Sequence, residues 1–141
     1  IGLCLVGSEM CIRDRTSGGI ADGSNVILTS TYVNTGNHYS TTNGRFTAPV
    51  AGVYLFFWSA IGNAAGDVYR WFLRKNGSTF GDVHLRQDTS QSGIEYATNS
   101  ARVQMISLSA NDYVNIYFDS DGGTSAYYQG EYVTFGGYLI G

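Results

Sequence analysis

The stretch of sequence that decides the fold is NTGNHYSTTNGRFTAPVAGVYLFFW, residues 34–58. Within it, both alternating sets of residues in the run 53–58 are apolar, so the strand that this run predicts must be covered on both faces. Asn43 and Gly44 suit the tight turn of a hairpin, because both residue types tolerate a positive φ angle. Pro49 follows the hairpin at a position between strands, where its missing N–H leaves no ladder hydrogen bond unmade. The stretch therefore predicts a hairpin that leads into a central, buried strand.

The rest of the chain continues this pattern of short apolar runs divided by turns. The runs are rich in Val, Ile, Thr, Tyr and Phe, and turn pairs such as Asn76-Gly77 recur about every ten residues. This spacing is typical of an all-β sandwich or barrel, and no window shows the helical period with capping residues. The predicted strands, about ten in number, cover residues 25–33, 37–41, 44–48, 52–61, 68–75, 79–86, 94–98, 100–108, 112–119 and 131–140.

The composition excludes two classes of protein. Only 13% of the 141 residues are charged, against about 25% in an ordinary soluble domain. The formal net charge is −3, which excludes the basic surface with which most nucleic-acid binders neutralise phosphates. No apolar run approaches the ~20 residues that a membrane-spanning helix needs. We therefore expect neither a nucleic-acid partner nor insertion into a membrane.

Two later strands combine a core face with a tyrosine face. Tyr113 and Tyr117 share one face of the run 113–118, and Tyr138 is on the tyrosine face of the run 132–139. Because tyrosine buries a large area while keeping a polar tip, it suits a surface that meets a partner. The alternative is a solvent-facing sheet that carries tyrosines. The low charge of the chain favours a sheet that another subunit covers.

The first fifteen residues differ from the rest of the chain. They hold both cysteines, Cys4 and Cys11, and their apolar start is too short for the core of a signal peptide. They closely resemble a peptide that arises when sequencing-adapter read-through is translated in assembled environmental data; the alternative is a genuine N-terminal arm. We therefore predict an artefactual or disordered leader at residues 1–15, a flexible linker at 16–23, and one domain at 24–141.

The spacing of residues around the central strand resembles the signature of the globular head of complement C1q. That family shares its jelly-roll fold with the tumour necrosis factor-like ligands. The matching positions are Asn34, Tyr39, Phe46, Gly52, Tyr54 and Phe56, followed by Phe135 and Gly137 in the closing strand. The resemblance covers residues 24–141 and implies a two-sheet jelly-roll β-sandwich of the C1q/TNF-like type. We expect these residues to determine the fold and not to act as functional side chains.

The same resemblance implies a homotrimer, in which one sheet of each subunit packs around a threefold axis. On strand parity, the residues expected in that contact are Leu55, Phe57, Tyr113, Tyr117 and Tyr138. If Tyr54 and Phe56 fill the core, their neighbours must point to the other side of the strand.

Two functions fit this interpretation. The first is a non-enzymatic recognition head whose exposed loops, such as 62–67, 87–93 and 121–130, bind a protein, glycan or cell-surface ligand. The alternative is a structural, trimerising tip or decoration domain of a fibre, including the tail fibre of a phage or virion. Both place the protein in the extracellular space or on a virion surface.

Catalytic motifs are lacking in the sequence. No nucleophile elbow, phosphate-binding loop, dinucleotide fingerprint or paired-histidine metal motif occurs. His38 and His84 are the two residues that suit a general base, but His38 stands beside Tyr39 of the family signature, where a structural role is expected. We therefore expect that the protein is not an enzyme.

Asp119 and Asp121 are the candidates for a metal site. They place two carboxylates in one loop, and oxygen ligands of this kind suit calcium. A hydrophilic turn is the alternative. Because some members of the C1q family bind calcium, the resemblance keeps calcium as the one cofactor to be considered.

Overall fold

The computed structural model describes residues 10–13, 18–60, 68–88, 100–123, 126–128 and 133–141. These residues form thirteen strands and one short 3-10 helix, η1 (Thr35–Asn37). The strands are β1 (Met10–Arg13), β2 (Gly18–Ile20), β3 (Ser24–Asn25), β4 (Ser30–Asn34), β5 (Tyr39–Ser40), β6 (Arg45–Thr47), β7 (Gly52–Ala60), β8 (Val68–Lys75), β9 (Ser78–Asp88), β10 (Ser100–Leu108), β11 (Tyr113–Ser120), β12 (Ala126–Tyr128) and β13 (Thr134–Leu139).

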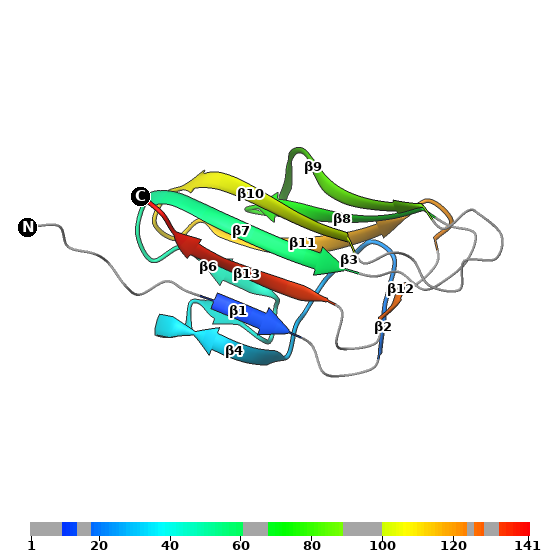
Figure 1. Ribbon diagram of the computed structural model, residues 1–141, viewed down its shortest axis with the longest axis horizontal. Coiled ribbons are helices and arrows are strands. Elements are labelled where there is room, and N and C mark those ends of the chain that lie inside the picture. Colours follow the sequence, from blue (N-terminus) through cyan, green and yellow to red (C-terminus); the bar gives the residue numbers. More distant parts are fainter. Residues whose placement is uncertain (1–9, 14–17, 61–67, 89–99, 124–125, 129–132) are drawn as a thin grey trace, which may run out of the picture.

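The strands build two stacked sheets (Figure 1). The front sheet has the strand order β10-β7-β13-β1-β4, and the back sheet has the order β5-β6-β11-β8-β9 with β3 paired to β11. Strands β12 and β2 form a separate two-stranded ribbon at one end of the molecule (Figure 1). The predicted all-β, two-sheet jelly-roll sandwich is confirmed. There are more strands than the roughly ten expected, because β1, β2 and β12 lie outside the predicted runs and the run 25–33 is divided between β3 and β4. The predicted strand at 94–98 lies outside the described residues.

Strand β7 is the central strand that residues 53–58 predict, and it lies between β10 and β13. The side chains of Tyr54, Phe56 and Trp58 are at most 1% exposed and face the core between the sheets. Leu55 and Phe57 alternate with them and are half-buried. One face of β7 therefore packs in the core, and the other lies on the outside of the front sheet.

Aromatic rings from both sheets form the centre of the core. Phe46 of β6 meets Phe56 of β7 edge to face, with ring centroids 5.5 Å apart. Phe56 stacks on Phe135 of β13 at 5.7 Å, and Tyr39 of β5 meets Phe135 edge to face at 6.2 Å. Gly137, next along the inward face of β13, leaves no room for a Cβ beside the Phe56 ring. These residues of the family signature therefore connect the front sheet to the back sheet through ring contacts, which are worth more than their buried area alone.

The expected tight turn at Asn43 and Gly44 joins β5 to β6. Gly44 has a φ angle of 71°, and its N–H donates to the carbonyl of Ser40 at 2.9 Å. A Cβ at Gly44 would collide with the carbonyl oxygen of Val26. Glycine is thus required here both for its backbone conformation and for the space that it leaves.

Two predicted boundaries differ from the structure. Gly18–Ile20, expected within a flexible linker, form β2, and the side chain of Ile20 is only 6% exposed in the core. Met10–Arg13, expected within a leader outside the domain, form β1 and pair with both β13 and β4. Short segments such as these become strands through backbone hydrogen bonds to partners far away in the sequence, which local composition does not report. That residues 1–15 derive from adapter sequence stays a prediction.

Candidate interaction surfaces

The five residues expected in one trimer contact lie on two different sheets. Leu55 and Phe57 of β7 and Tyr138 of β13 are on the outer face of the front sheet. Tyr113 and Tyr117 belong to β11 and lie on the outer face of the back sheet. The expectation that all five share one sheet face is therefore wrong. Parity decides on which side of its strand a side chain lies, but not to which sheet the strand belongs.

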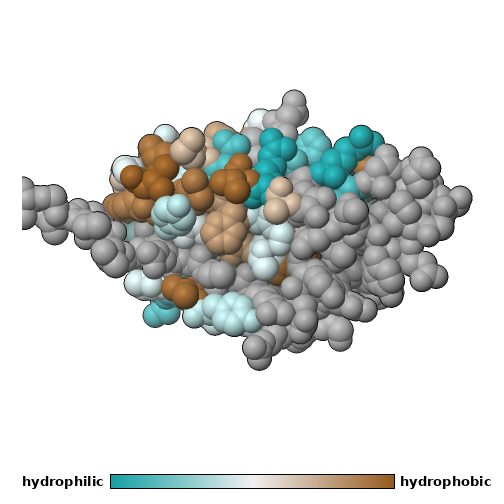
Figure 2. All heavy atoms as spheres, in the orientation of Figure 1, coloured by the Kyte–Doolittle hydropathy of each residue, from teal (hydrophilic) through white to brown (hydrophobic). Residues whose placement is uncertain are grey.

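The outer face of β10, β7 and β13 carries exposed apolar side chains (Figure 2). Val103 and Met105 of β10 are 59% and 57% exposed, and the strand register places them beside Phe57 and Leu55. Tyr138, which is 43% exposed, lies opposite Leu55 on the other side of β7. We name these five residues the front apolar face. Contiguous exposed apolar surface of this kind marks an interaction site in soluble proteins.

The ring of Phe57, in the front apolar face, stands over Gly136 of β13. Its strand partner on β13 is Gly136. A Cβ at Gly136 would stand only 2.6 Å from Cε2 of the Phe57 ring, so the ring occupies the space above the glycine. A side chain at position 136 would therefore push the ring out of its place.

On the back sheet, the two tyrosines of β11 are covered by arginine side chains. The guanidinium carbon of Arg45 is 4.1 Å from the centroid of the Tyr113 ring, and that of Arg74 is 3.2 Å from the centroid of the Tyr117 ring. Both distances are within the range of cation–π contacts. The outer face of β11 therefore presents guanidinium groups and not bare tyrosine rings.

The candidate calcium ligands Asp119 and Asp121 lie at the end of β11 and just after it. Nη1 of Arg70 is 3.2 Å from Oδ2 of Asp119 and 2.5 Å from Oδ1 of Asp121. The pKa of Arg70 is raised above its ordinary value, first by the hydrogen bond with Asp121. Within the described residues, no three or more His, Cys, Asp or Glu side chains are grouped to hold a metal ion. Calcium takes about six to eight oxygen ligands, and within the described residues the two carboxylates share an arginine and have no third acidic ligand beside them.

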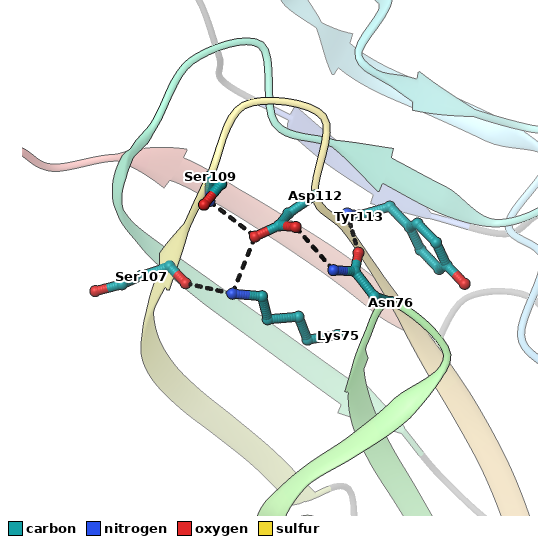
Figure 3. Close-up of polar contacts among 6 residues, drawn as sticks. All are labelled: Lys75, Asn76, Ser107, Ser109, Asp112 and Tyr113. Atoms are coloured by element: carbon teal, nitrogen blue, oxygen red, sulfur yellow. Dashed lines mark hydrogen bonds and ion pairs between the residues drawn. The ribbon is translucent and has the colours of Figure 1, made fainter.

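A polar network ties the turn between β8 and β9 to the turn between β10 and β11 (Figure 3). Asn76 donates to Oδ1 of Asp112 at 2.7 Å, and Nζ of Lys75 is 3.0 Å from Oδ2 of the same carboxylate. The N–H of Ser109 donates to Oδ2 of Asp112 at 2.8 Å, and Oδ1 of Asn76 accepts the N–H of Tyr113 at 2.9 Å. The hydrogen bond from Asn76, followed by those from Ser109 and Lys75, lowers the pKa of Asp112 to about 2. The network therefore joins two turns of the sandwich.

The comparison with family models decides to which family the chain belongs. The C1q domain matches residues 12–140. The chain belongs to the C1q domain family. Among solved structures, the globular domain of zebrafish complement 1qA protein is similar with a TM-score of 0.68 and 17% identity, over 95% of this chain and 98% of that chain. The crystal structure of murine APRIL at pH 8.5 is similar with a TM-score of 0.66 and 8% identity, over 94% and 98% of the two chains. The resemblance to the globular head of complement C1q is thus confirmed, and the likeness to these solved structures shows a shared fold.

Both histidines of this C1q domain pack as aromatic side chains. His38 follows η1, and its ring meets Phe46 edge to face at 6.4 Å. His84 of β9 packs against Phe72 at 5.1 Å, with its Nδ1 atom buried. Among the described residues, neither imidazole bonds to a carboxylate that would orient it as a base.

In the same part of the chain, no helix is long and apolar enough to cross a membrane.

The loops expected to bind a ligand lie only partly within the described residues. Residues 62–67 lie outside them, as do residues 89–93 of the loop 87–93. Of the loop 121–130, residues 121–123 and 126–128 are described. The candidate interaction surfaces among the described residues are therefore the outer faces of the two sheets.

Four residues of these faces were not predicted from the sequence. Val103 and Met105 lie two residues apart, a spacing that could have indicated one face of a strand. Arg45 and Arg74 are far from Tyr113 and Tyr117 in the sequence, and only the strand register brings them together. No local pattern reports that pairing.

Proposed function

We propose that this C1q domain assembles into a homotrimer and acts as a non-enzymatic binding head in the extracellular space or on a virion surface. The front apolar face carries the proposal. Its side chains lie on rigid strands at the outside of the sandwich, and no charged residue is among them. Interfaces between identical subunits are more apolar than the rest of a protein surface.

The proposed occupant of the front apolar face is the same face of two further copies of this chain. Domains of the C1q and tumour necrosis factor families form trimers, and the low charge of this chain supports the same assembly. Leu55, Phe57 and Tyr138 remain proposed contacts, to which the structure adds Val103 and Met105. Tyr113 and Tyr117 would stay outside the contact, because they lie on the other sheet.

Sedimentation equilibrium of the full chain tests the trimer. We expect the mass of three subunits for the wild type and of one subunit for Met105→Asp and Tyr138→Asp. Each subunit would bring a charge to the axis, and desolvated like charges oppose association. Tyr117→Asp is the matched control, since it makes the same change on the back sheet and should leave the trimer intact. A monomeric wild type, or trimers of both front-sheet variants, would contradict the proposal.

The binding role is tested separately on an array of glycans and cell-surface proteins, with and without calcium. We expect the trimeric chain to bind a defined subset of the array and the Met105→Asp monomer to bind the same subset more weakly. The weaker binding follows from the loss of multivalency. If the trimer binds nothing on the whole array, the result would favour the structural tip of a fibre instead.

A further inference from the structure

We propose that the outer face of the back sheet binds an acidic polysaccharide through Arg45 and Arg74. The proposal names a ligand class for the binding role above and rests on that role, but it does not depend on the trimer. It also moves the expected contact from the loops to a sheet face.

The strand register brings the two arginines into one row. Asn115 of β11 pairs with Arg45 of β6 on one side and with Arg74 of β8 on the other. Cross-strand partners project from the same face of a sheet, so the three side chains share the outer face. Arg45 leans over Tyr113 and Arg74 over Tyr117, which stand on opposite sides of Asn115 along β11. At about 3.3 Å per residue, the two rings are roughly 13 Å apart along the strand.

Neither arginine has an acidic partner within the described residues. On the same face, by contrast, Arg70 is held between Asp119 and Asp121. The Nε atoms of Arg45 and Arg74 are buried without a hydrogen-bond partner in that part of the chain. Both arginines are partly exposed, and the planar N–H fork of a guanidinium matches the oxygens of a carboxylate or sulfate. An external anion would therefore pair with the terminal N–H groups, while the buried Nε atoms stay out of its reach.

The tyrosine rings fix these guanidinium groups before any ligand arrives. A flexible arginine loses side-chain entropy when it binds, and that loss weakens binding. Stacking on Tyr113 and Tyr117 orients Arg45 and Arg74 in the free protein. Two oriented charges that stand on separate strands suit a chain with repeated anionic groups better than a single small anion.

The groups beside the arginines favour a saccharide over a nucleic acid. Phe72 is partly exposed and lies between Tyr117 and His84 in the next row of the sheet. Aromatic side chains of this kind suit the C–H faces of sugars. A nucleic acid would need a surface that neutralises many phosphates, whereas the chain has a net charge of −3.

The experiment measures binding of the full chain to immobilised polysaccharides by biolayer interferometry. The probes are heparin for sulfate groups, alginate for carboxylate groups, dextran as the neutral polymer and single-stranded DNA as the other polyanion. We expect binding to heparin, alginate or both, weakened between about 50 and 200 mM salt, and none to dextran. Whether heparin or alginate binds more tightly tells which anionic group the site prefers.

Single variants test the two arginines. Arg45→Gln and Arg74→Gln should each weaken binding about tenfold, because each removes a charge-assisted contact. Arg102→Gln is the control of equal charge, since Arg102 lies on β10 and donates to the carbonyl of His84. Tyr117→Leu keeps every charge but removes the ring under Arg74, so it should weaken binding with no change in net charge. Arg74→Lys, which keeps the charge and loses the fork, should also bind more weakly.

Several results would overturn the proposal. One is an equal loss of binding in Arg102→Gln, which would mean general charge attraction; another is DNA binding as tight as polysaccharide binding. A trimeric wild type that binds none of the acidic polysaccharides would also overturn it while leaving the trimer standing. Conversely, a Met105→Asp monomer that still binds heparin or alginate through Arg45 and Arg74 would support this site whatever the state of assembly.

Discussion

The side-chain amide of Asn34 holds the backbone of Tyr39 from both directions. Its Oδ1 accepts the N–H of Tyr39 at 3.1 Å, and its Nδ2 donates to the carbonyl of Tyr39 at 2.9 Å. The Tyr39 hydroxyl in turn accepts the N–H of Leu28 at 3.1 Å, inside the core. A carboxamide offers an N–H donor and a carbonyl acceptor on one small planar group. Asn34 therefore fixes the η1 turn and with it the position of a core ring.

Replacing Asn34 should destabilise the fold without changing its architecture. We expect Asn34→Asp and Asn34→Ala to lower the free energy of unfolding by about 1–3 kcal/mol, since each leaves a partly buried backbone group of Tyr39 without its partner. Urea denaturation measures the change. Thr31→Ala, at an exposed position of the same strand, is the control and should stay within about 0.5 kcal/mol of wild type. Equal stability of wild type and Asn34→Asp would show that the donor half of the pair is unimportant.

Gly44 should be less replaceable than another glycine of similar conformation. Gly44 and Gly81 have φ angles of 71° and 58°, but a Cβ at Gly44 meets the Val26 carbonyl, whereas a Cβ at Gly81 meets nothing within 4 Å. Gly81→Ala should cost only the strain of positive φ, about 1–2 kcal/mol. Gly44→Ala should cost more by thermal or urea unfolding, because backbone must also move. Similar losses in the two variants would mean that the backbone conformation alone selects glycine at position 44.

The Asp112 network should make stability depend on pH in the acid range. The folded pKa of about 2 lies below the unfolded value near 3.8, so the contribution is fully present above pH 4 and is lost as the pH falls toward 2. We expect the melting temperature of Asp112→Asn to lie below that of wild type at pH 6, and the difference to shrink at pH values between about 4 and 2. Thermal scans at each pH measure it. A difference that stays constant over this range would mean that the ionised carboxylate is not what stabilises the turns.

Calcium should leave the stability of the wild type unchanged. Arg70 already binds both Asp119 and Asp121, so the two carboxylates are neutralised from within the chain. In Arg70→Ala the pair loses that cation, but two carboxylates still fall short of the about six to eight ligands of calcium, so we expect calcium to leave the melting temperature of this variant unchanged as well. A calcium-dependent rise in the wild type that Asp121→Asn abolishes would instead establish the loop as a calcium site.

Replacing Gly136 should change the assembly more than the fold. In Gly136→Ala the new methyl group would push the Phe57 ring out of its place in the front apolar face. We expect the variant to sediment with weaker self-association than wild type, while circular dichroism still shows β-structure. Trimers as stable as those of wild type would place the contact elsewhere on the sheet.

The sequence alone determined the features that depend on near neighbours. Alternation in residues 53–58 predicted which side chains of β7 face the core, and the Asn43-Gly44 pair predicted the hairpin, because side-chain direction and turn conformation are local properties of the backbone. The spacing from Asn34 to Phe56 alone is enough to suggest the family.

Only the tertiary structure decided which strands share a sheet. It separated Tyr113 and Tyr117 from Leu55 and Phe57, and it placed Arg45 and Arg74 on either side of Asn115. It also set Arg70 between the carboxylates that the sequence had suggested for calcium. Strand pairing depends on hydrogen bonds between segments that are distant in the chain. The residues of one strand do not indicate which other strand will pair with it. The sequence therefore determined the fold, and the pairing of strands decided which side chains share each face of it.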